Sequence, residues 1–95
     1  MYRAEIISNQ SVQDDIVELL ETEIEGIEYT ILPAVQGRGV NSKKLGYTVW
    51  PEQNFVLFTF VEKEAAQIIK QIITALKQKF PREGISLFFT EVAAL

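Results

Sequence analysis

The stretch that decides the fold is FVLFTFVEKEAAQIIKQIITALKQKFPREGISLFFTEV, residues 55–92. Its first seven residues are aromatic, β-branched or leucine, a composition typical of a strand. An amphipathic helix follows, because glutamates lie at its positive end, lysines lie at its negative end and apolar residues recur between them at helical spacing. Pro81 ends this helix, Gly84 turns the chain, and residues 85–92 are predicted to form another strand.

The preceding part of the chain begins with the same order of strand and helix. Residues 2–8 alternate Tyr, Ala and Ile on one face with Arg, Glu and Ile on the other, which is the period of a strand. Ser11 and Asp14 indicate a helix start, with the Ser11 hydroxyl expected to cap the free amides, and the helix is expected to run to about Glu23. Gly26 is expected to end it in a left-handed turn.

A second strand is predicted over Ile27 to Val35, where Pro33 indicates an edge strand or a bulge. The full order is then β-α-β-β-α-β. This order predicts an α+β fold of the ferredoxin-like type, with an antiparallel sheet and both helices on one face. A chain of 95 residues without an internal linker, repeat or low-complexity segment is expected to form one domain over residues 1–95.

Apolar residues occupy both faces of the last two predicted strands. An antiparallel sheet covered on one face only should alternate apolar and polar residues. Two apolar faces instead predict an oligomer, because large exposed apolar patches usually mark association. The alternative is a few aromatic residues on a tolerated surface. In this assignment Phe55, Leu57 and Val61 face opposite to Val56, Phe58 and Phe60, and Leu87 and Phe89 face opposite to Ile85 and Phe88.

A long polar segment, QGRGVNSKKLGYTVWP at Gln36 to Pro51, separates the second and third predicted strands. It contains no acidic residue, although the net charge of the chain is −4. Loops of this length are usually functional or disordered, and glycine amides beside cationic side chains suit a phosphate or carboxylate. The alternative is a solvated loop whose lysines only improve solubility. The candidate residues are Gly37, Arg38, Gly39, Lys43 and Lys44, with Trp50 as a hydrophobic anchor or as a lid on the core.

Composition argues against several kinds of function. The chain has no cysteine and no histidine, which removes disulfides, thiolate metal sites, the commonest metal ligand and the commonest general base. No metal site and no catalytic residue are therefore assigned. The net charge of −4 disfavours nucleic-acid binding. No segment approaches the roughly 20 apolar residues of a membrane span, and the N-terminus is too short and polar for a signal peptide, so a soluble cytoplasmic protein is expected.

Two phosphate-binding motifs do not fit the loop. Gly37-Arg38-Gly39 continues to Ser42 where a dinucleotide fingerprint needs glycine, and a strand rather than a helix follows. The same segment lacks the Gly-Lys-Ser/Thr of a P-loop. A similarity to acylphosphatase is local, because the loop of that family follows the first strand and this one follows the second.

As a whole the chain resembles the PII signalling family of nitrogen-regulatory proteins and its shorter PII-like relatives. The resemblance rests on the order βαββαβ, on Val35-Gln36-Gly37-Arg38-Gly39 opening a long loop, and on Glu83-Gly84 before the segment ISLFF at 85–89. As topology it covers nearly all of the chain, whereas the motif identity is short. It implies a homotrimer, an exposed loop at 36–51 (the family's T-loop) that engages a partner protein, and small-molecule effectors held in clefts between subunits.

The resemblance also bears on individual residues. Gly84 lies in the turn that carries phosphate contacts in the family, and Asn41 falls where the family has a glutamine that helps to hold magnesium and 2-oxoglutarate. Ile85 stands where a nucleotide-binding lysine is expected, and the basic C-terminal segment that helps to hold ATP has no counterpart before Leu95. We therefore expect a small anionic effector other than the conventional one, and its identity, like that of any cofactor, is unknown.

Two other functions fit the same topology. An ACT-like amino-acid sensor shares βαββαβ but normally pairs its sheets edge to edge as a dimer, so a mass measurement separates the two. A small enzyme that handles phosphoryl groups would depend on Arg38, although no histidine is present to act as a base. The leading prediction is a regulatory binding protein without enzymatic activity.

Overall fold

The computed structural model describes residues 1–38 and 52–95, and it confirms the predicted order of strands and helices. No helix in these two ranges is long and apolar enough to cross a membrane. The elements are β1 (Tyr2–Asn9), a 3-10 helix η1 (Gln10–Val12), α1 (Gln13–Glu23), β2 (Thr30–Gly37), β3 (Glu52–Val61), α2 (Lys63–Lys79) and β4 (Ser86–Glu91).

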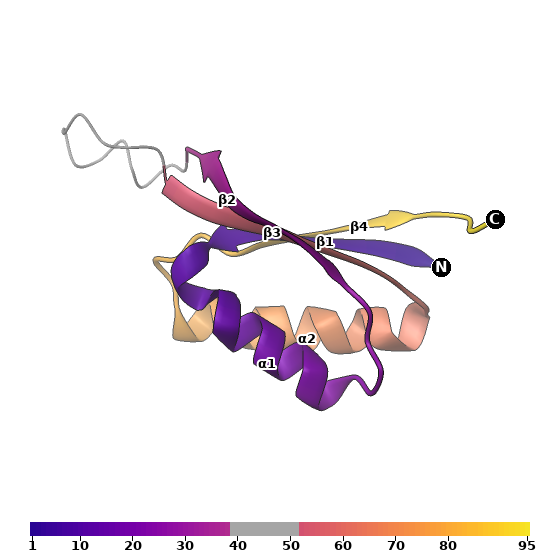
Figure 1. Ribbon diagram of the computed structural model, residues 1–95. Coiled ribbons are helices and arrows are strands. Elements are labelled where there is room, and N and C mark those ends of the chain that lie inside the picture. The colour runs from indigo at the N-terminus through magenta and orange to yellow at the C-terminus, as the bar shows by residue number, and fades with distance from the viewer. Residues whose placement is uncertain (39–51) are drawn as a thin grey trace.

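The four strands form one antiparallel sheet in the order β2-β3-β1-β4. Both helices cover the same face of this sheet, and no helix of the described chain lies on the opposite face (Figure 1). β1 and β3 are therefore central, whereas β2 and β4 are the two edges. The predicted ferredoxin-like α+β fold, with two helices on one face, is confirmed.

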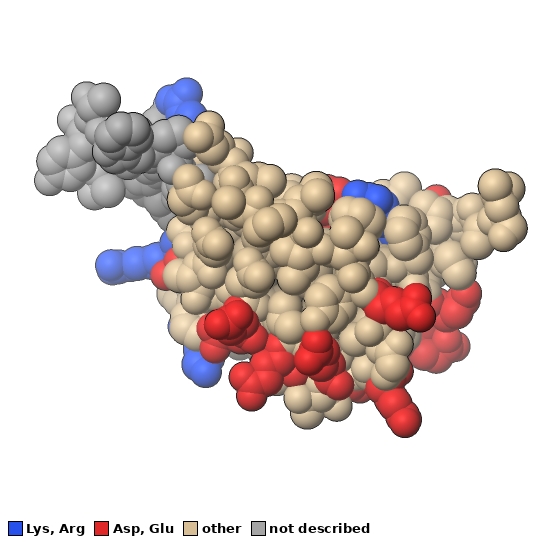
Figure 2. Space-filling model, viewed as in Figure 1, with Lys and Arg blue, Asp and Glu red and all other residues tan. Residues whose placement is uncertain are grey.

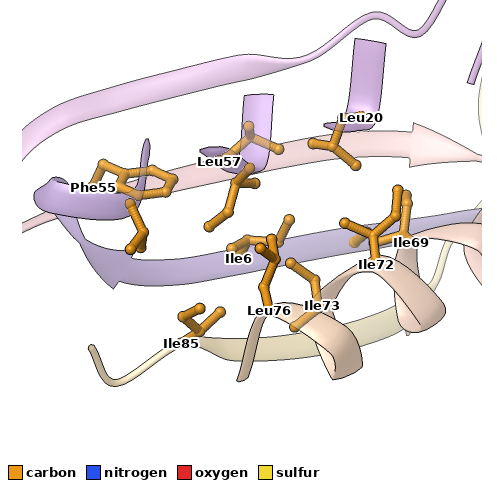
Figure 3. Packing of buried hydrophobic residues seen from close by; sticks show 12 residues of the cluster. Ile6, Leu20, Phe55, Leu57, Ile69, Ile72, Ile73, Leu76 and Ile85 are labelled. Atoms are coloured by element: carbon orange, nitrogen blue, oxygen red, sulfur yellow. The ribbon is translucent and has the colours of Figure 1, made fainter. Parts of the chain in front are cut away.

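The core lies between the sheet and the two helices (Figure 3). Alternate residues of β1 and β3 point into it, because successive side chains of a strand point to opposite faces. α2 adds an apolar stripe at helical spacing, while α1 buries fewer residues and packs against α2. The buried apolar residues include Ala4, Ile6, Val12, Ile16, Leu20, Phe55, Leu57, Ile69, Ile73 and Leu76.

The predicted facing of Ile85 is wrong. Ile85 is buried in the core, with 4% of its surface exposed, instead of sharing a side with Phe88. Leu87 lies opposite Ile6 on the helix-covered face, and Phe88 lies opposite Glu5 on the other face. The physical reason is the period of a strand, which puts positions 85 and 87 on one side and position 88 on the other.

The predicted cap at Ser11 is also wrong. Asn9 supplies the cap instead, because its Oδ1 accepts a hydrogen bond of 2.9 Å from Ser11 N at the start of η1. Asp14 and Asp15 do lie in the first turn of α1, at the positive end of the helix dipole. Gly26 has φ +70°, which confirms the left-handed turn after the helix.

β2 is an irregular edge strand, as Pro33 predicts. The register of β2 against β3 shifts between Leu32 and Val35, and Ala34 has a φ of +54° within the shift. A bulge of this kind bends an edge strand and interrupts its row of free backbone groups.

The strand is placed later than the predicted range of Ile27 to Val35. It begins at Thr30 and continues to Gly37, with Gln36 opposite Gln53 of β3. The first two residues of the predicted loop at 36–51 therefore belong to β2.

Candidate functional site

One end of the sheet collects the segments that the sequence associates with ligand binding (Figure 1). At this end β1 stops at Asn9, β2 stops at Gly37, and β4 begins at Ser86 after the turn from α2. The polar segment of the sequence analysis also leaves and re-enters the sheet here. We call this region the loop end; its described parts are residues 9–11, 36–38, 52–54 and 80–86.

Gly37 packs closely against the side chain of Asn54. Gly37 pairs with Glu52 across the β2–β3 ladder. A positive φ does not explain glycine at this position, because among the described glycines Gly26 and Gly84 are the ones with positive φ. A Cβ added to Gly37 would lie 2.2 Å from Nδ2 of Asn54, far inside van der Waals contact. Asn54 therefore excludes a side chain at position 37 while it stays in its observed position.

Two hydrogen bonds connect the turn between α2 and β4 to the turn between β1 and α1. Asn9 N donates a hydrogen bond to Glu83 O at 3.4 Å, and Ser11 Oγ donates one to Glu83 Oε2 at 2.8 Å. Gly84 then turns the chain into β4 with a φ of +61°. The contact between Glu83 and Ser11 is not predicted from the sequence, because 72 positions separate the two residues and no local pattern links them.

Arg38 and Gly84 lie at opposite edges of the sheet. Arg38 follows β2 and Gly84 precedes β4, and both are exposed. Three interstrand steps separate β2 from β4 in the sheet order. At about 4.8 Å per step, the two edges are roughly 14 Å apart. A single copy of the chain does not bring these two predicted residues together.

The other predicted site residues, Gly39, Asn41, Lys43, Lys44 and Trp50, lie outside the described residues. Their assignment stays a prediction. The described residues locate only the two ends of this segment, at Arg38 after β2 and at Glu52 in β3.

Charge is distributed unevenly over the described surface. Figure 2 shows acidic side chains gathered mainly over the helix layer. α1 and the segment that leads to β2 contain acidic residues and no basic ones, so this side of the molecule is negative. Arg38 lies away from them at the loop end. The acidic residues are Asp14, Asp15, Glu18, Glu21, Glu23, Glu25 and Glu28.

Tyr29 has a raised pKa, but it lies far from the loop end. Its hydroxyl donates a hydrogen bond to Glu21, and this bond is the main cause of the raised pKa, followed by burial and by the negative charge of Glu21. Tyr29 precedes β2 at the end of the sheet opposite the loop end (Figure 1). This shifted group therefore plays no part in the candidate site.

Two shallow grooves in the described part of the chain also lie apart from the predicted residues. One runs along the outer side of α2, past Gln67, Gln71 and Gln78. The other is apolar and lies between α2 and the β1–β4 edge, where Tyr2 and Phe89 contribute to its walls. Neither groove contains Gly37, Arg38 or Gly84.

The sheet face without helices is a second candidate surface, and it is largely apolar. We call it the free face. The strand registers assign to it the apolar residues Ile7, Leu32, Val56, Phe58, Phe60 and Phe88, the charged residues Arg3 and Glu5, and the polar residues Thr30, Ser86 and Thr90. Leu32 is 49% exposed, Phe60 51% and Phe88 57%. The prediction that β3 is apolar on both sides is confirmed, since Phe55 and Leu57 are buried on the other face.

Comparison with known proteins gives matches among solved structures. No protein-family model matches the chain, and no curated protein matches it in sequence. CPII from Thiomonas intermedia K12, bound to ADP and bicarbonate, is similar with a TM-score of 0.72 and 17% identity, over 96% of this chain and 84% of that chain. The apo form of CPII gives a TM-score of 0.67 and 15% identity, over 96% and 87%. A putative PII-like signalling protein from Thermus thermophilus gives a TM-score of 0.67 and 25% identity, over 96% and 84%.

These similarities define the class of fold. The chain has the fold of PII-like proteins, as the resemblance in its sequence implies. CPII is described as a nitrogen regulatory PII-like protein, and the Thermus thermophilus protein as a putative PII-like signalling protein. At these identities the similarity establishes the fold, so the roles of individual residues have to be argued from the geometry of this chain.

Proposed function

We propose that this chain is a PII-like regulatory protein that assembles as a homotrimer, binds a small anionic effector between subunits and presents the loop at 36–51 to a partner protein. The observation that carries the proposal is the PII-like fold, with a TM-score of 0.72 over 96% of the chain. The proposal treats residues 1–95 as one domain that acts in cytoplasmic signalling, with a regulatory and not an enzymatic role.

The free face supports the assembly. Three large apolar residues on it, Leu32, Phe60 and Phe88, are each about half exposed. Exposed apolar patches of this kind mark surfaces that associate, because covering them removes apolar area from water. A homotrimer with its sheets packed inward covers this face in every subunit.

The positions of Arg38 and Gly84 support an effector site between subunits. They lie at opposite edges of one sheet, so a cleft that combines them needs the β2 edge of one copy beside the β4 edge of the next. A guanidinium group and turn amides together suit an anion. CPII is bound to ADP and bicarbonate, and to ADP, AMP and acetate, which makes adenine nucleotides and small carboxylate-like anions the first effectors to test.

Two measurements test the proposal. Native mass spectrometry at micromolar concentration should give three times the chain mass of 10.8 kDa. Thermal shift against ATP, ADP, AMP, cyclic nucleotides, 2-oxoglutarate and bicarbonate should then show at least one stabilising ligand, since a ligand at 100 times its dissociation constant adds roughly 2.7 kcal/mol. Arg38→Gln should weaken binding of that ligand, while Lys70→Gln, which removes a matched exposed charge from the middle of α2, should leave it unchanged.

Each outcome bears on a different part of the proposal. A dimer would favour the ACT-like alternative, and a monomer would refute the assembly. A trimer that responds to no member of the panel would leave the assembly standing and overturn the effector. Equal ligand affinity in Arg38→Gln and Lys70→Gln would remove Arg38 from the site.

A further inference from the structure

An ion pair lies within the apolar free face. Nη2 of Arg3 donates a hydrogen bond of 2.9 Å to Oε1 of Glu5, and both residues belong to the central strand β1. The strand registers put Glu5 between Phe58 and Phe88, and put Arg3 beside Phe60. Glu5 is therefore flanked by aromatic residues on both neighbouring strands, whereas Arg3 has Phe60 on the β3 side and Thr90 on the β4 side.

The guanidinium group of Arg3 lies back over this aromatic surface. Its Cζ is 4.3 Å from the centre of the Phe58 ring and 5.8 Å from that of the Phe60 ring. The two rings meet edge to face, with centroids 6.1 Å apart and an interplanar angle of 79°. A guanidinium cation over a ring face gains a cation–π interaction, and its fork shape also suits the carboxylate.

Both charged side chains are already shielded although no helix covers them. The side chains of Arg3 and Glu5 are 32% and 33% exposed. Folding has therefore already removed much of the contact between these side chains and water, so a partner displaces less water from them. Each charge also has its counter-charge within the same chain. Covering these two side chains leaves neither of their charges unpaired, which is the condition that makes burial of an ion pair tolerable.

We propose that the Arg3–Glu5 pair determines the specificity of subunit association on the free face. The pair allows a second copy of this chain to cover the face, and it penalises any packing that separates the two charges or leaves one of them alone. This inference rests on the homotrimer of the proposed function and names the residues that select its partner.

The second copy is the occupant that the charges favour. The pair is neutral as a unit, so identical faces brought together do not repel each other, and no complementary charge from a different protein is needed. A buried polar or ionic group can set register and oligomeric state, because misaligned packing leaves it unsatisfied. A free face without the ion pair would lack this constraint, and two copies could then associate in more than one register.

A double-mutant cycle with the oligomeric state as readout tests the inference. Glu5→Gln leaves Arg3 without its counter-charge, and Arg3→Met leaves the Glu5 carboxylate among phenylalanines. Each should raise the protein concentration of half-dissociation by at least about 100-fold, since breaking a buried pair on one side is strongly unfavourable. In the double variant Arg3→Met/Glu5→Leu, the concentration of half-dissociation should return to within about 10-fold of the wild-type value or fall below that value. Native mass spectrometry of this double variant should show mixed oligomeric states.

The controls separate this inference from the proposed function. Glu23→Gln makes the same chemical change on exposed α1 and should leave assembly unchanged, and circular dichroism reports whether each variant is folded. A wild-type trimer whose dissociation is unaltered by Glu5→Gln, or single variants whose effects simply add in the double variant, would overturn the inference alone. A monomeric wild type would overturn both proposals.

Discussion

Replacing Ser8 with alanine should stabilise the protein, although Ser8 is almost completely buried. Ser8 is 1% exposed on the helix-covered side of β1, where the register places it opposite Phe55. Its Oγ has no hydrogen-bond partner among the described residues. A buried hydroxyl without a partner loses its hydrogen bonds to water and gains none in return.

The expected size of the effect follows from two opposing contributions. An unsatisfied buried hydroxyl costs about 1–3 kcal/mol, whereas the void left by one missing oxygen costs less than about 1 kcal/mol. The net change in the free energy of unfolding for Ser8→Ala is therefore a gain of up to about 3 kcal/mol, and a gain of about 1 kcal/mol corresponds to a rise of several degrees in Tm for a chain of this size. Most core substitutions act in the opposite direction, which makes the sign of the change decisive.

Thr59 offers a matched control on the same face of the sheet. It is also 1% exposed, but its Oγ1 donates a hydrogen bond to the backbone oxygen of Glu28. Thr59→Val keeps the shape and leaves that carbonyl oxygen without this donor, so it should lower the free energy of unfolding by about 1 kcal/mol. The two substitutions of buried hydroxyls should therefore have opposite signs.

Urea unfolding followed by circular dichroism measures both variants, at one fixed protein concentration because association adds to apparent stability. The reasoning would be refuted if Ser8→Ala lowered the midpoint by as much as Thr59→Val. That result would mean that the Ser8 hydroxyl does form a hydrogen bond in solution, for example to a buried water molecule.

Three further predictions concern other parts of the molecule. Gly37→Ala should lower the free energy of unfolding by at most about 1 kcal/mol, because the Asn54 side chain must move away from the added Cβ. The same substitution in an Asn54→Ala background should cost clearly less, and equal costs in both backgrounds would rule out that clash. Phe88→Asp should prevent assembly by placing a charge on the free face, whereas Gln71→Asp on the outer side of α2 should not, and native mass spectrometry distinguishes the two. Folding raises the pKa of Tyr29, so the contribution of its hydroxyl to stability is present below about pH 10 and is lost as the pH rises through the folded pKa. The wild type should therefore lose more stability than Tyr29→Phe between about pH 9 and about pH 11. Parallel losses in the two proteins would argue against the Glu21 contact.

Much of the secondary structure follows from local patterns in the chain. The period of two in residues 2–8, the helical stripe before Pro81 and the glycines at 26 and 84 predict elements that the structure confirms. Pro33 correctly indicates both an edge and a bulge, since proline removes a ladder donor wherever it occurs. These signals depend on neighbouring residues, and neighbouring residues are visible in a sequence.

The errors arise where a distant segment competes with a local rule. Ser11 looks like a helix cap, yet its hydroxyl reaches Glu83 and Asn9 supplies the cap. β2 starts and ends later than predicted because its pairing with β3 holds it as far as Gly37. A hydroxyl group or a strand end can satisfy several partners, and only the folded chain determines which of them is close.

By itself, the sequence determined the order βαββαβ, the two-sided apolar character of β3 and the basic, glycine-bearing segment between the middle strands, because each is a matter of composition and spacing. Tertiary structure alone decided that β4 is the other edge of the sheet, and so placed Arg38 and Gly84 on opposite sides of one chain. It also decided that the Asn54 side chain packs against Gly37 and that Arg3 lies over Phe58 while bound to Glu5. These contacts depend on strand register and on packing between distant segments, which no local pattern encodes.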